Sequence, residues 1–365
     1  MENKTTIDSL IIKSAYFLLI VIGILSTSNL NTVISSTTLS GIDLILAIII
    51  AINVIINILS KERISTKMFY FLCLILLSLI LSLIFRSYSI VLLYLCGIST
   101  FNFSSRELVK IYFNSTLVGI GISIVLGVLG LIDSSSLGFG NKNTVGFYLF
   151  SECLLYFYLN QNFKKSTKIF TLIILFFIEF FAIKDRTAGI LSIIYLLIIL
   201  IKRNNNALKG KVIVTLPFIL AIISTFLGKN FTLNSNWMSF LNKMLSNRLL
   251  FWNFNLNQYA IEFFPQRIET FSVLLNDGRF TTNYLDNGYL NFLIGIGYFQ
   301  TIILLLIICI AIKRIILQGK YSELMIIVIF LLYAFTEKAI FSPICCILFP
   351  LCFLEIKLSY VDKRN

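Results

Sequence analysis

Long apolar runs place the strongest constraint on how this chain can fold. Residues 189–201 and 301–312 present almost nothing polar on any helical face. Across the whole chain 58% of the residues are hydrophobic and only 13% are charged. A helix that is apolar all round belongs in lipid or in a very large core, and a chain of 365 residues cannot build such a core around so many helices. The sequence therefore predicts an integral membrane protein.

The spanning elements are predicted to be helices. Only helices and closed barrels satisfy every backbone polar group inside lipid, and the alternating pattern of barrel strands is absent from this sequence. A helix needs about 20 residues to cross a bilayer. We therefore expect an all-α, polytopic protein with a single membrane domain over residues 1–365 and about 12 transmembrane helices. They are expected near 10–28, 40–59, 68–85, 88–103, 110–132, 144–160, 168–184, 187–202, 211–228, 288–312, 322–337 and 340–357.

The basic residues give this arrangement a direction. The formal net charge is +13, and the short loops alternate between basic and non-basic along the chain. With the N-terminus inside, 20 of the 30 basic residues fall on the inner side, which is the bias that sets membrane orientation. We expect both termini in the cytoplasm. The positive charge is then explained by topology, and no nucleic-acid partner is expected.

The positions of the cysteines and the absence of histidine limit the kinds of site that the chain is expected to contain. All seven cysteines lie in apolar stretches and none lies in an outer loop, so neither a disulfide framework nor a metal-ligand spacing is expected. Histidine is absent, which removes the commonest zinc ligand and the commonest general base. We expect no metal and no cofactor, and any general base has to be an Asp, Glu or Tyr.

One connection is much longer than the others. Residues 229–287, between the ninth and tenth spans, form a large extracytoplasmic loop that is rich in aromatic residues. Apolar residues between 237 and 252 follow helical spacing and stop before Pro265. We expect helices lying in the membrane interface, with Trp and Tyr side chains at headgroup depth.

Ten basic residues lie on the outer side against the topology bias. Cations there suit an enzyme that acts on an anionic lipid headgroup, and the planar fork of arginine grips phosphate oxygens bidentately. Arg186 stands between two apolar spans with almost no loop around it, where a charge is costly. Its alternative role is a snorkelling charge, or one paired with Asp185, at a helix end. The ten are Arg86, Lys142, Lys184, Arg186, Lys229, Lys243, Arg248, Arg267, Arg279 and Lys338.

The other outer cations have alternatives of the same kind. Arg248 falls on the expected interfacial helix, where it could bind a ligand or anchor the helix beside an aromatic belt. Arg267 and Arg279 fit a solvated loop as well as they fit a ligand. Lys142 lies in the segment 138–146, whose glycines, Asn and Thr suit an ordinary turn and helix cap. The functional alternative for that segment is a helix N-terminus facing an anion.

Carboxylates supply the candidate bases. Asp286, which precedes the tenth span, could cap that helix or act as a base at the outer face. Other carboxylates are weaker candidates, and two of them fall inside spans. These weaker candidates are Glu152, Glu179, Glu262, Glu269 and Glu337.

Four short segments follow one another along the chain. The first is an Asn/Gly segment, Gly140-Asn141-x-Asn143-x-x-Gly146, and the second is Asp185-Arg186-Thr187-Ala188 at the head of a helix. The third is Arg248-x-x-x-Trp252 in the large loop. The fourth is Asp286-Asn287-x-Tyr289-Leu290, followed by Gly295 and Gly297. In this order the segments resemble those of the O-antigen polymerase and ligase superfamily, and the resemblance covers roughly residues 110–315.

The resemblance implies a Wzy-type polymerase of capsule, exopolysaccharide or O-antigen repeat units in the bacterial plasma membrane. Such enzymes have an all-helical fold related to the GT-C glycosyltransferases and work without a metal ion as inverting transferases. They move the growing glycan from undecaprenyl pyrophosphate onto the non-reducing end of a new lipid-linked unit at the outer face. Their expected partners are the lipid-linked oligosaccharide, the bilayer, and the flippase and chain-length regulator of the same pathway.

The resemblance also implies roles for individual residues. Arg186 and Arg248 would hold the pyrophosphate, and Asp286 would orient or deprotonate the acceptor hydroxyl. The ligase branch has histidine where this chain has Asp286, which favours a polymerase. The remaining expected substrate-binding residues are Lys142, Asn143, Arg267, Arg279, Asn287, Tyr289 and Trp252.

Three other functions fit the same sequence. A ligase of the same superfamily would transfer finished polysaccharide to another acceptor. A flippase or transporter of the lipid-linked oligosaccharide would more often show two similar halves and broken spans, whereas this chain is asymmetric. A structural membrane protein without enzymatic activity is the third alternative.

Overall fold

A computed structural model describes residues 2–59, 66–85, 87–200, 207–269, 272–274, 280–282 and 284–361. The described chain is helical apart from its connections and one small hairpin. The first eight helices are α1 (Glu2–Ser26), α2 (Ser36–Leu59), α3 (Thr66–Ile84), α4 (Tyr88–Ser99), α5 (Ser105–Val128), α6 (Lys142–Leu159), α7 (Lys165–Phe177) and α8 (Arg186–Leu200). Those that follow are α9 (Ala207–Lys229), α10 (Asn236–Met244), α11 (Arg248–Gln258), α12 (Gly288–Gly295), α13 (Gly297–Leu317), α14 (Tyr321–Ala334) and α15 (Leu348–Val361).

Short helical turns connect several of these helices. They are η1 (Asn29–Thr32), η2 (Thr100–Asn102), η3 (Ser135–Gly138), η4 (Ile178–Ile183) and η5 (Lys338–Phe341), of which η4 is a π-helical turn continuing α7. The hairpin joins β1 (Ser272–Leu274) and β2 (Phe280–Thr282).

The helices have the character of a membrane-embedded protein, as the composition predicts. Within the described chain, four segments are long and apolar enough to cross a membrane, and six further apolar helices are shorter. Many large side chains on these helices face outward, such as Ile222 and Phe226 on α9 and Phe181 in η4. Burying such side chains in lipid removes the cost of exposing them to water. The four long segments are Ser105–Val128, Lys165–Ile183, Gly210–Lys229 and Gly297–Leu317.

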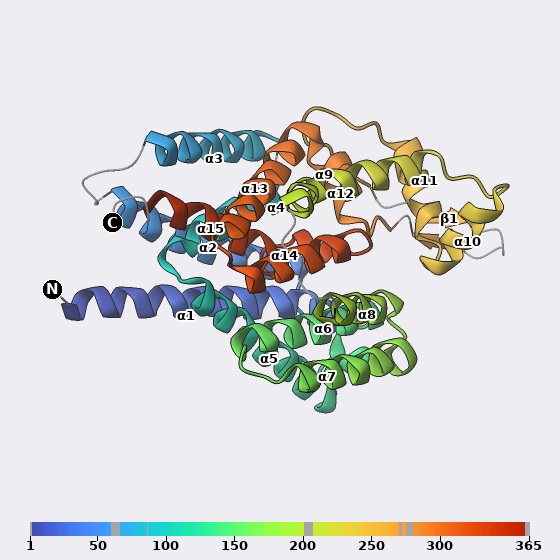
Figure 1. The fold of residues 1–365 in the computed structure, drawn as a ribbon, viewed down its shortest axis with the longest axis horizontal. Coiled ribbons are helices and arrows are strands. Elements are labelled where there is room, and N and C mark those ends of the chain that lie inside the picture. Colours follow the sequence, from blue (N-terminus) through green and yellow to red (C-terminus); the bar gives the residue numbers. More distant parts are fainter. Residues whose placement is uncertain are drawn as a thin grey trace.

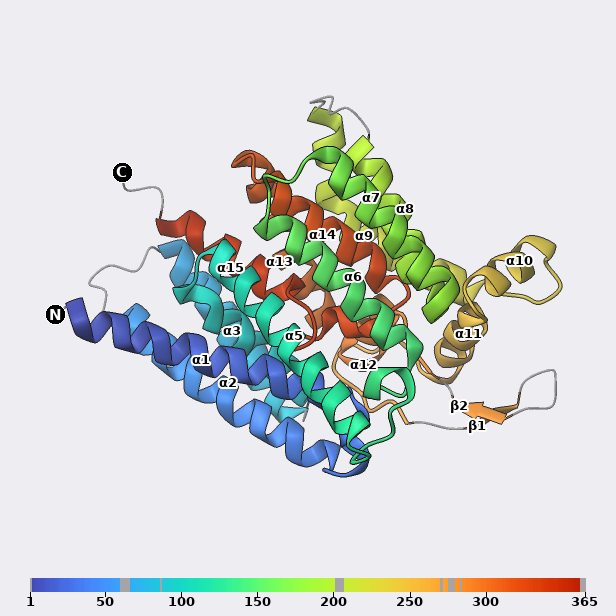
Figure 2. The same cartoon turned by 90° about the horizontal axis from the view of Figure 1, so that it is seen from below.

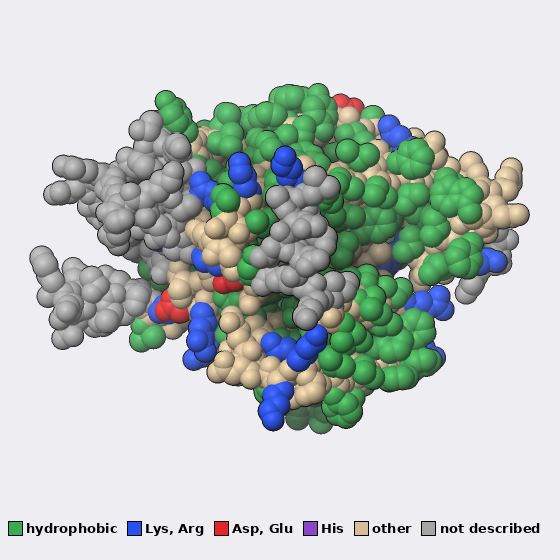
Figure 3. Space-filling view, viewed as in Figure 1, with side chains coloured by type: hydrophobic (Ala, Val, Ile, Leu, Met, Phe, Trp, Pro, Cys, Tyr) green, Lys and Arg blue, Asp and Glu red, His purple; other side chains and the backbone are tan. Residues whose placement is uncertain are grey.

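The two ends of the molecule differ. α1 begins and α15 ends at one end, whereas α10, α11 and the hairpin lie at the opposite end (Figures 1 and 2). Hydrophobic side chains cover much of the visible face between them, and Lys and Arg gather mainly toward the end where α1 begins (Figure 3). α13 lies in the interior, where it packs against α9, α12, α14 and α15. Because the middle of the bundle is apolar, a site for a polar or charged ligand is expected at one of its ends.

The tenth expected span, 288–312, is a helix with a break. α12 ends at Gly295 and α13 starts at Gly297, whose φ of +79° lies in the left-handed region that glycine tolerates. A Cβ atom there would collide with the backbone of Phe263 and Phe264. The Tyr298 N–H, freed by the break, donates to the Glu262 carbonyl at 2.9 Å. The large loop therefore docks into the break and is held to the bundle by backbone hydrogen bonds.

The last expected span begins later than its hydropathy suggests. A helix was expected over 340–357, whereas α15 begins at Leu348 after turns that contain Pro343. Proline has no N–H to donate and disfavours a helical conformation in the residue before it, which accounts for the delayed start. The Pro343 carbonyl accepts a hydrogen bond from the Tyr112 hydroxyl, so the non-helical backbone is satisfied inside the bundle.

The large loop contains the helices expected of it and one element that was not expected. α10 and α11 cover the predicted helical stretch, broken where Ser246 and Asn247 take left-handed conformations. β1 and β2 pair antiparallel, with Val273 opposite Thr281. Strands of three residues are too short to show an alternating pattern, so they cannot be predicted from the sequence.

Candidate functional site

A pocket of about 490 Å³ opens at the end of the molecule that carries the large loop. It is formed by α8, α9, α11, α14 and the segment before α12. Its walls have two characters, one polar and one apolar. The polar wall consists of Asn143, Lys184, Asp185, Arg186, Thr187, Ser246, Arg248, Tyr284, Asp286 and Thr336. All four sequence segments that resemble the polymerase superfamily reach this wall: the first contributes Asn143, and each of the other three contributes at least one charged side chain.

The apolar wall continues down the bundle. α8 and α9 both pack against α14 but scarcely contact one another, so a groove remains between them with α14 as its floor. Ile190 and Ile223 are part of this wall and are partly exposed. The apolar wall consists of Ile190, Leu191, Ile194, Leu220, Ile223, Met244, Leu245, Phe251, Leu332 and Phe335.

A tight turn brings Asp185 and Arg186 to the mouth of the pocket. The π-helical turn η4 ends at Ile183, and Lys184 takes a left-handed conformation with φ +66°. The Asp185 N–H donates to the Glu179 carbonyl at 2.9 Å, which closes the turn before α8 begins. π-turns often occur at functional sites, where the extra residue re-aims the chain.

Asp185 caps α8 and does not pair with Arg186. Its Oδ1 accepts hydrogen bonds from the N–H groups of Thr187 at 3.0 Å and Ala188 at 3.2 Å. Its Oδ2 accepts one from the Tyr333 hydroxyl at 3.1 Å. Burial raises the pKa of this carboxyl, although the Ala188 N–H and the other donors oppose the shift. Arg186 is left exposed in the pocket wall, without a hydrogen bond or ion pair to any described residue.

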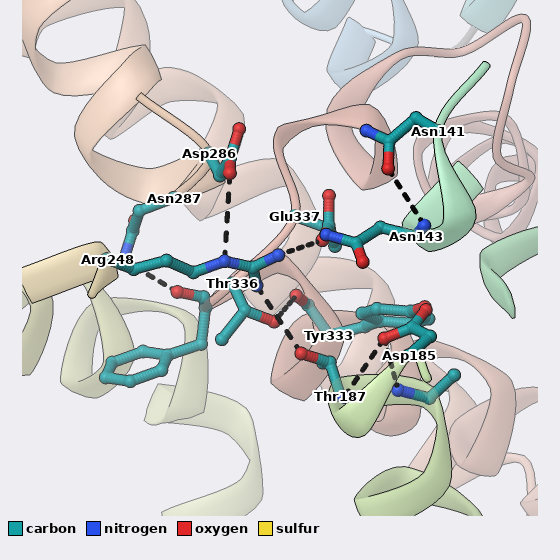
Figure 4. A network of polar contacts seen from close by, with 12 residues as sticks. Asn141, Asn143, Asp185, Thr187, Arg248, Asp286, Asn287, Tyr333, Thr336 and Glu337 are labelled. Atoms are coloured by element: carbon teal, nitrogen blue, oxygen red, sulfur yellow. Dashed lines mark hydrogen bonds and ion pairs between the residues drawn. The ribbon is translucent and has the colours of Figure 1, made fainter. Parts of the chain in front are cut away.

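Arg248 lies at the centre of the polar wall (Figure 4). Its side chain is only 8% exposed, and its Nη2 donates to Glu337 Oε1 at 2.5 Å. Its Nε lies 3.7 Å from Asp286 Oδ2, and its Nη1 donates to Thr187 Oγ1 at 3.4 Å. Burial works against the charged guanidinium, but Glu337 and Asp286 outweigh it and raise the pKa of Arg248. The arginine is a fixed positive charge held between two carboxylates.

Glu337 is the more deeply placed of these two carboxylates. It follows α14 and is 14% exposed, compared with 33% for Asp286. Burial raises the pKa of Glu337 to about 7, with Arg248 opposing the shift and Asp286 and Asp185 adding to it. This carboxyl therefore changes its protonation near neutral pH, and with it the charge that faces Arg248.

Gly146 allows two of the sequence segments to meet. It lies on α6, directly against Asp185, and a Cβ atom at this position would collide with the Asp185 carboxylate. At the start of the same helix Asn141 is the N-cap and accepts a hydrogen bond from the Asn143 N–H at 2.9 Å. Capping explains why an Asn occurs at position 141, and close packing explains why a glycine occurs at position 146.

We expect Gly146→Val to destabilise the protein and displace Asp185. Overpacking a closely packed site costs roughly 1–3 kcal/mol. The matched control is Gly121→Val on α5, because Gly121 is exposed and has no atom within 4 Å of a Cβ position. The thermal unfolding midpoint of the detergent-solubilised protein should fall for Gly146→Val and stay near the wild-type value for Gly121→Val. Equal midpoints for the two variants would rule out this packing argument.

The expected site residues divide into those that line the pocket and those that do not. Arg186, Arg248, Asp286 and Asn143 line it together. Lys142 and Arg267 are exposed and do not line it. Arg279 lies outside the described residues, as does the outer cation Arg86.

Trp252, Asn287 and Tyr289 are fully buried and support the pocket from behind. Asn287 caps α12 by accepting from the Leu290 N–H at 2.9 Å, so the helix cap is this residue and not Asp286. The Asn287 amide also donates to the Phe335 carbonyl at 2.8 Å.

Tyr289 and Trp252 pack against the end of α14. The Tyr289 hydroxyl donates to the Leu331 carbonyl at 2.9 Å, and Trp252 packs edge-on against Phe335. These contacts join the fourth segment to the end of α14.

The polar network includes residues that the sequence did not single out as important. Glu337 is one of the weaker candidate bases in the sequence. In the structure it forms an ion pair with Arg248, although the two residues are 89 positions apart in the chain. Thr187, Tyr333 and Thr336 have no feature in the sequence that marks them individually as site residues. A polar cluster at the end of a long apolar helix is a signal that could have drawn attention to Thr336 and Glu337.

No protein-family model matches this chain, and no curated protein or solved structure matches it either. The fold and site are those of a helical membrane protein with a charged pocket at one end of the bundle. The chemistry of the pocket has to be argued from its own residues.

Proposed function

We propose that this chain is a polysaccharide polymerase of the bacterial plasma membrane. It would transfer the growing glycan from undecaprenyl pyrophosphate onto the non-reducing end of a new lipid-linked repeat unit. The observation that carries this proposal is the pocket, in which Arg186 and Arg248 stand above an apolar groove between α8 and α9. An isoprenoid pyrophosphate likewise has a charged head followed by an apolar chain, so its head would lie against the arginines and its chain in the groove.

The arginines suit the anionic part of such a donor. Arg186 is exposed in the pocket wall, and Arg248 in the same wall is held in place by Glu337. Arginine forks bind phosphate oxygens bidentately and remain charged at any physiological pH. Charge on the leaving pyrophosphate increases as its bond to the anomeric carbon breaks, so fixed cations stabilise the transition state more than the ground state.

The acceptor half of the reaction needs orientation more than activation. Pyrophosphate is a good leaving group, so positioning the acceptor hydroxyl against the anomeric carbon supplies much of the catalysis. Asp286 lines the pocket and is one-third exposed, which suits a carboxylate that orients or deprotonates that hydroxyl. An in-line attack opposite the leaving pyrophosphate inverts the anomeric configuration.

We also propose an orientation for the bundle. Its helices would cross the membrane about 12 times, with α12 and α13 forming one crossing and both termini in the cytoplasm. Support comes from the common end at which α1 begins and α15 ends, and from the basic side chains gathered toward that end (Figures 1 and 3). The pocket then faces the outer side, where lipid-linked repeat units are presented after flipping.

A deletion strain tests this function. Because the proposed enzyme consumes single repeat units, its loss should leave single units on undecaprenyl pyrophosphate in the outer leaflet and abolish high-molecular-weight polymer. The measurement is lipid-linked sugar analysis with leaflet-specific labelling, and the control is the strain complemented with wild-type protein. Accumulation in the inner leaflet would instead indicate a flippase. Unattached polymer of normal length would indicate a ligase.

A further inference from the structure

Arg248 faces more negative charge than a single cation can neutralise. Glu337 contacts it from the segment after α14, and Asp286 approaches from the segment before α12. Asp185, just before α8, lies near Glu337 and Arg248, and Tyr333 of α14 faces Asp185 and Glu337. The described positive charges around the pocket are Arg248, Arg186 and Lys184. Three carboxylates opposite three cations leave little net attraction for an anion when all are ionised.

Glu337 holds Arg248 from behind the pocket. It does not line the cavity, whereas Arg248 and Asp286 do. The contact of 2.5 Å to Nη2 directs that edge of the guanidinium away from the cavity. A phosphate that binds Arg248 then competes with the Glu337 carboxylate for the same positive charge. Protonation of Glu337 would remove the competitor and keep a hydrogen-bonding group in place.

We propose that Glu337 is a positioning residue that takes up a proton when the pyrophosphate of the lipid-linked donor binds to Arg248. This inference rests on the proposed function, because it assigns the donor to that pocket. No covalent bond changes in this step: a proton passes from solvent to a Glu337 oxygen as the pyrophosphate oxygens approach the guanidinium. When undecaprenyl pyrophosphate leaves, Glu337 ionises again and restores its ion pair with Arg248. Competition from the ionised Glu337 carboxylate for Arg248 lowers the affinity for undecaprenyl pyrophosphate and so helps its release.

The direction of the pH effect follows from the pKa of about 7 that burial gives Glu337. Below pH 7 the carboxyl is already protonated in the empty site, and binding the donor requires no further proton. Above pH 7 the carboxylate must first be protonated, so affinity falls as the pH rises. For one linked proton with this pKa, the dissociation constant should increase about tenfold between pH 6 and pH 8.

The test compares wild-type protein with Glu337→Gln, using undecaprenyl pyrophosphate as the probe in detergent micelles. The pyrophosphate titrates in this range itself, but its own contribution is the same for both proteins. We therefore expect the ratio of the wild-type to the variant dissociation constant to increase about tenfold from pH 6 to pH 8. Titration calorimetry at pH 8 in two buffers of different ionisation enthalpy should show about one proton more taken up by wild type than by the variant.

The possible results separate this inference from the proposed function. Parallel pH dependences for the two proteins, with equal proton uptake, would overturn the role of Glu337 and leave the polymerase proposal intact. Absence of any binding to wild type would overturn the proposed function itself. Should Glu337→Gln fail to accumulate, Glu337→Ala takes its place as the reference protein, and equal proton uptake by wild type and Glu337→Ala at pH 8 contradicts the inference. Glu337→Asp provides the conservative rescue and should restore the pH dependence in part.

Discussion

Replacing Arg248 by alanine is expected to abolish polymer formation and to destabilise the protein. The side chain is buried and holds two carboxylates, Glu337 and Asp286, so its loss leaves buried negative charge without a partner. Breaking a buried ion pair in this way costs roughly 3–5 kcal/mol, and protonation of Glu337 near neutral pH reduces that figure. Loss of one fixed charge at the transition state lowers turnover by roughly 10²–10³-fold.

Arg248→Lys separates the two effects. Lysine keeps a positive charge opposite Glu337, so the unfolding midpoint should stay close to that of wild type. It lacks the planar fork, so phosphate binding and turnover should still fall. Polymer length on gels and the thermal midpoint of the purified protein are the two readouts. Wild-type polymer from Arg248→Ala would remove this residue from the catalytic site.

Arg186→Ala should abolish polymer without destabilising the fold. The Arg186 side chain is exposed in the pocket wall and has no partner among the described residues, since Asp185 is engaged by Thr187, Ala188 and Tyr333. Substitutions of exposed residues outside such contacts usually change stability by less than about 0.5 kcal/mol. An effect on polymer would therefore report on ligand binding or catalysis.

The matched control for Arg186 is Lys243→Ala. Lys243 lies on α10 at the same end of the molecule, is exposed, and does not line the pocket. Both variants should reach the membrane in wild-type amounts, and only Arg186→Ala should lose polymer. Equal polymer from the two variants would mean that the outer cations act only through general surface charge.

Local patterns in the sequence predict the helical, apolar character of the chain, because lipid demands long apolar segments whatever the tertiary fold. The break at Gly297 was not predictable, since it depends on backbone groups of Phe263 and Phe264 that arrive from the large loop. The late start of α15 has a local cause in Pro343, which hydropathy does not detect, and the hydrogen bond from Tyr112 to the Pro343 carbonyl satisfies the non-helical backbone there.

The sequence indicated some of the residues that line the pocket but not their connections. Arg186 is notable because a charge between apolar spans is costly, Arg248 because it is an outer cation on the loop helix, and Asp286 because a chain without histidine needs another base. Glu337 was underrated because nothing local links it to Arg248. Asp286 is a possible cap of α12 by its residue type, but the cap is its neighbour Asn287, because Asp and Asn are both good N-caps and only the backbone decides between them.

The central claim is that the pocket binds a lipid through its pyrophosphate. The most direct test is the affinity of the purified protein for undecaprenyl pyrophosphate and for undecaprenol, measured for wild type and for Arg186→Ala. The proposed function predicts that wild type binds the pyrophosphate at least about tenfold more tightly than the alcohol, a difference of about 1.4 kcal/mol, and that Arg186→Ala loses most of this preference. Equal affinity of wild type for the two lipids, or a preference unchanged in Arg186→Ala, would contradict it.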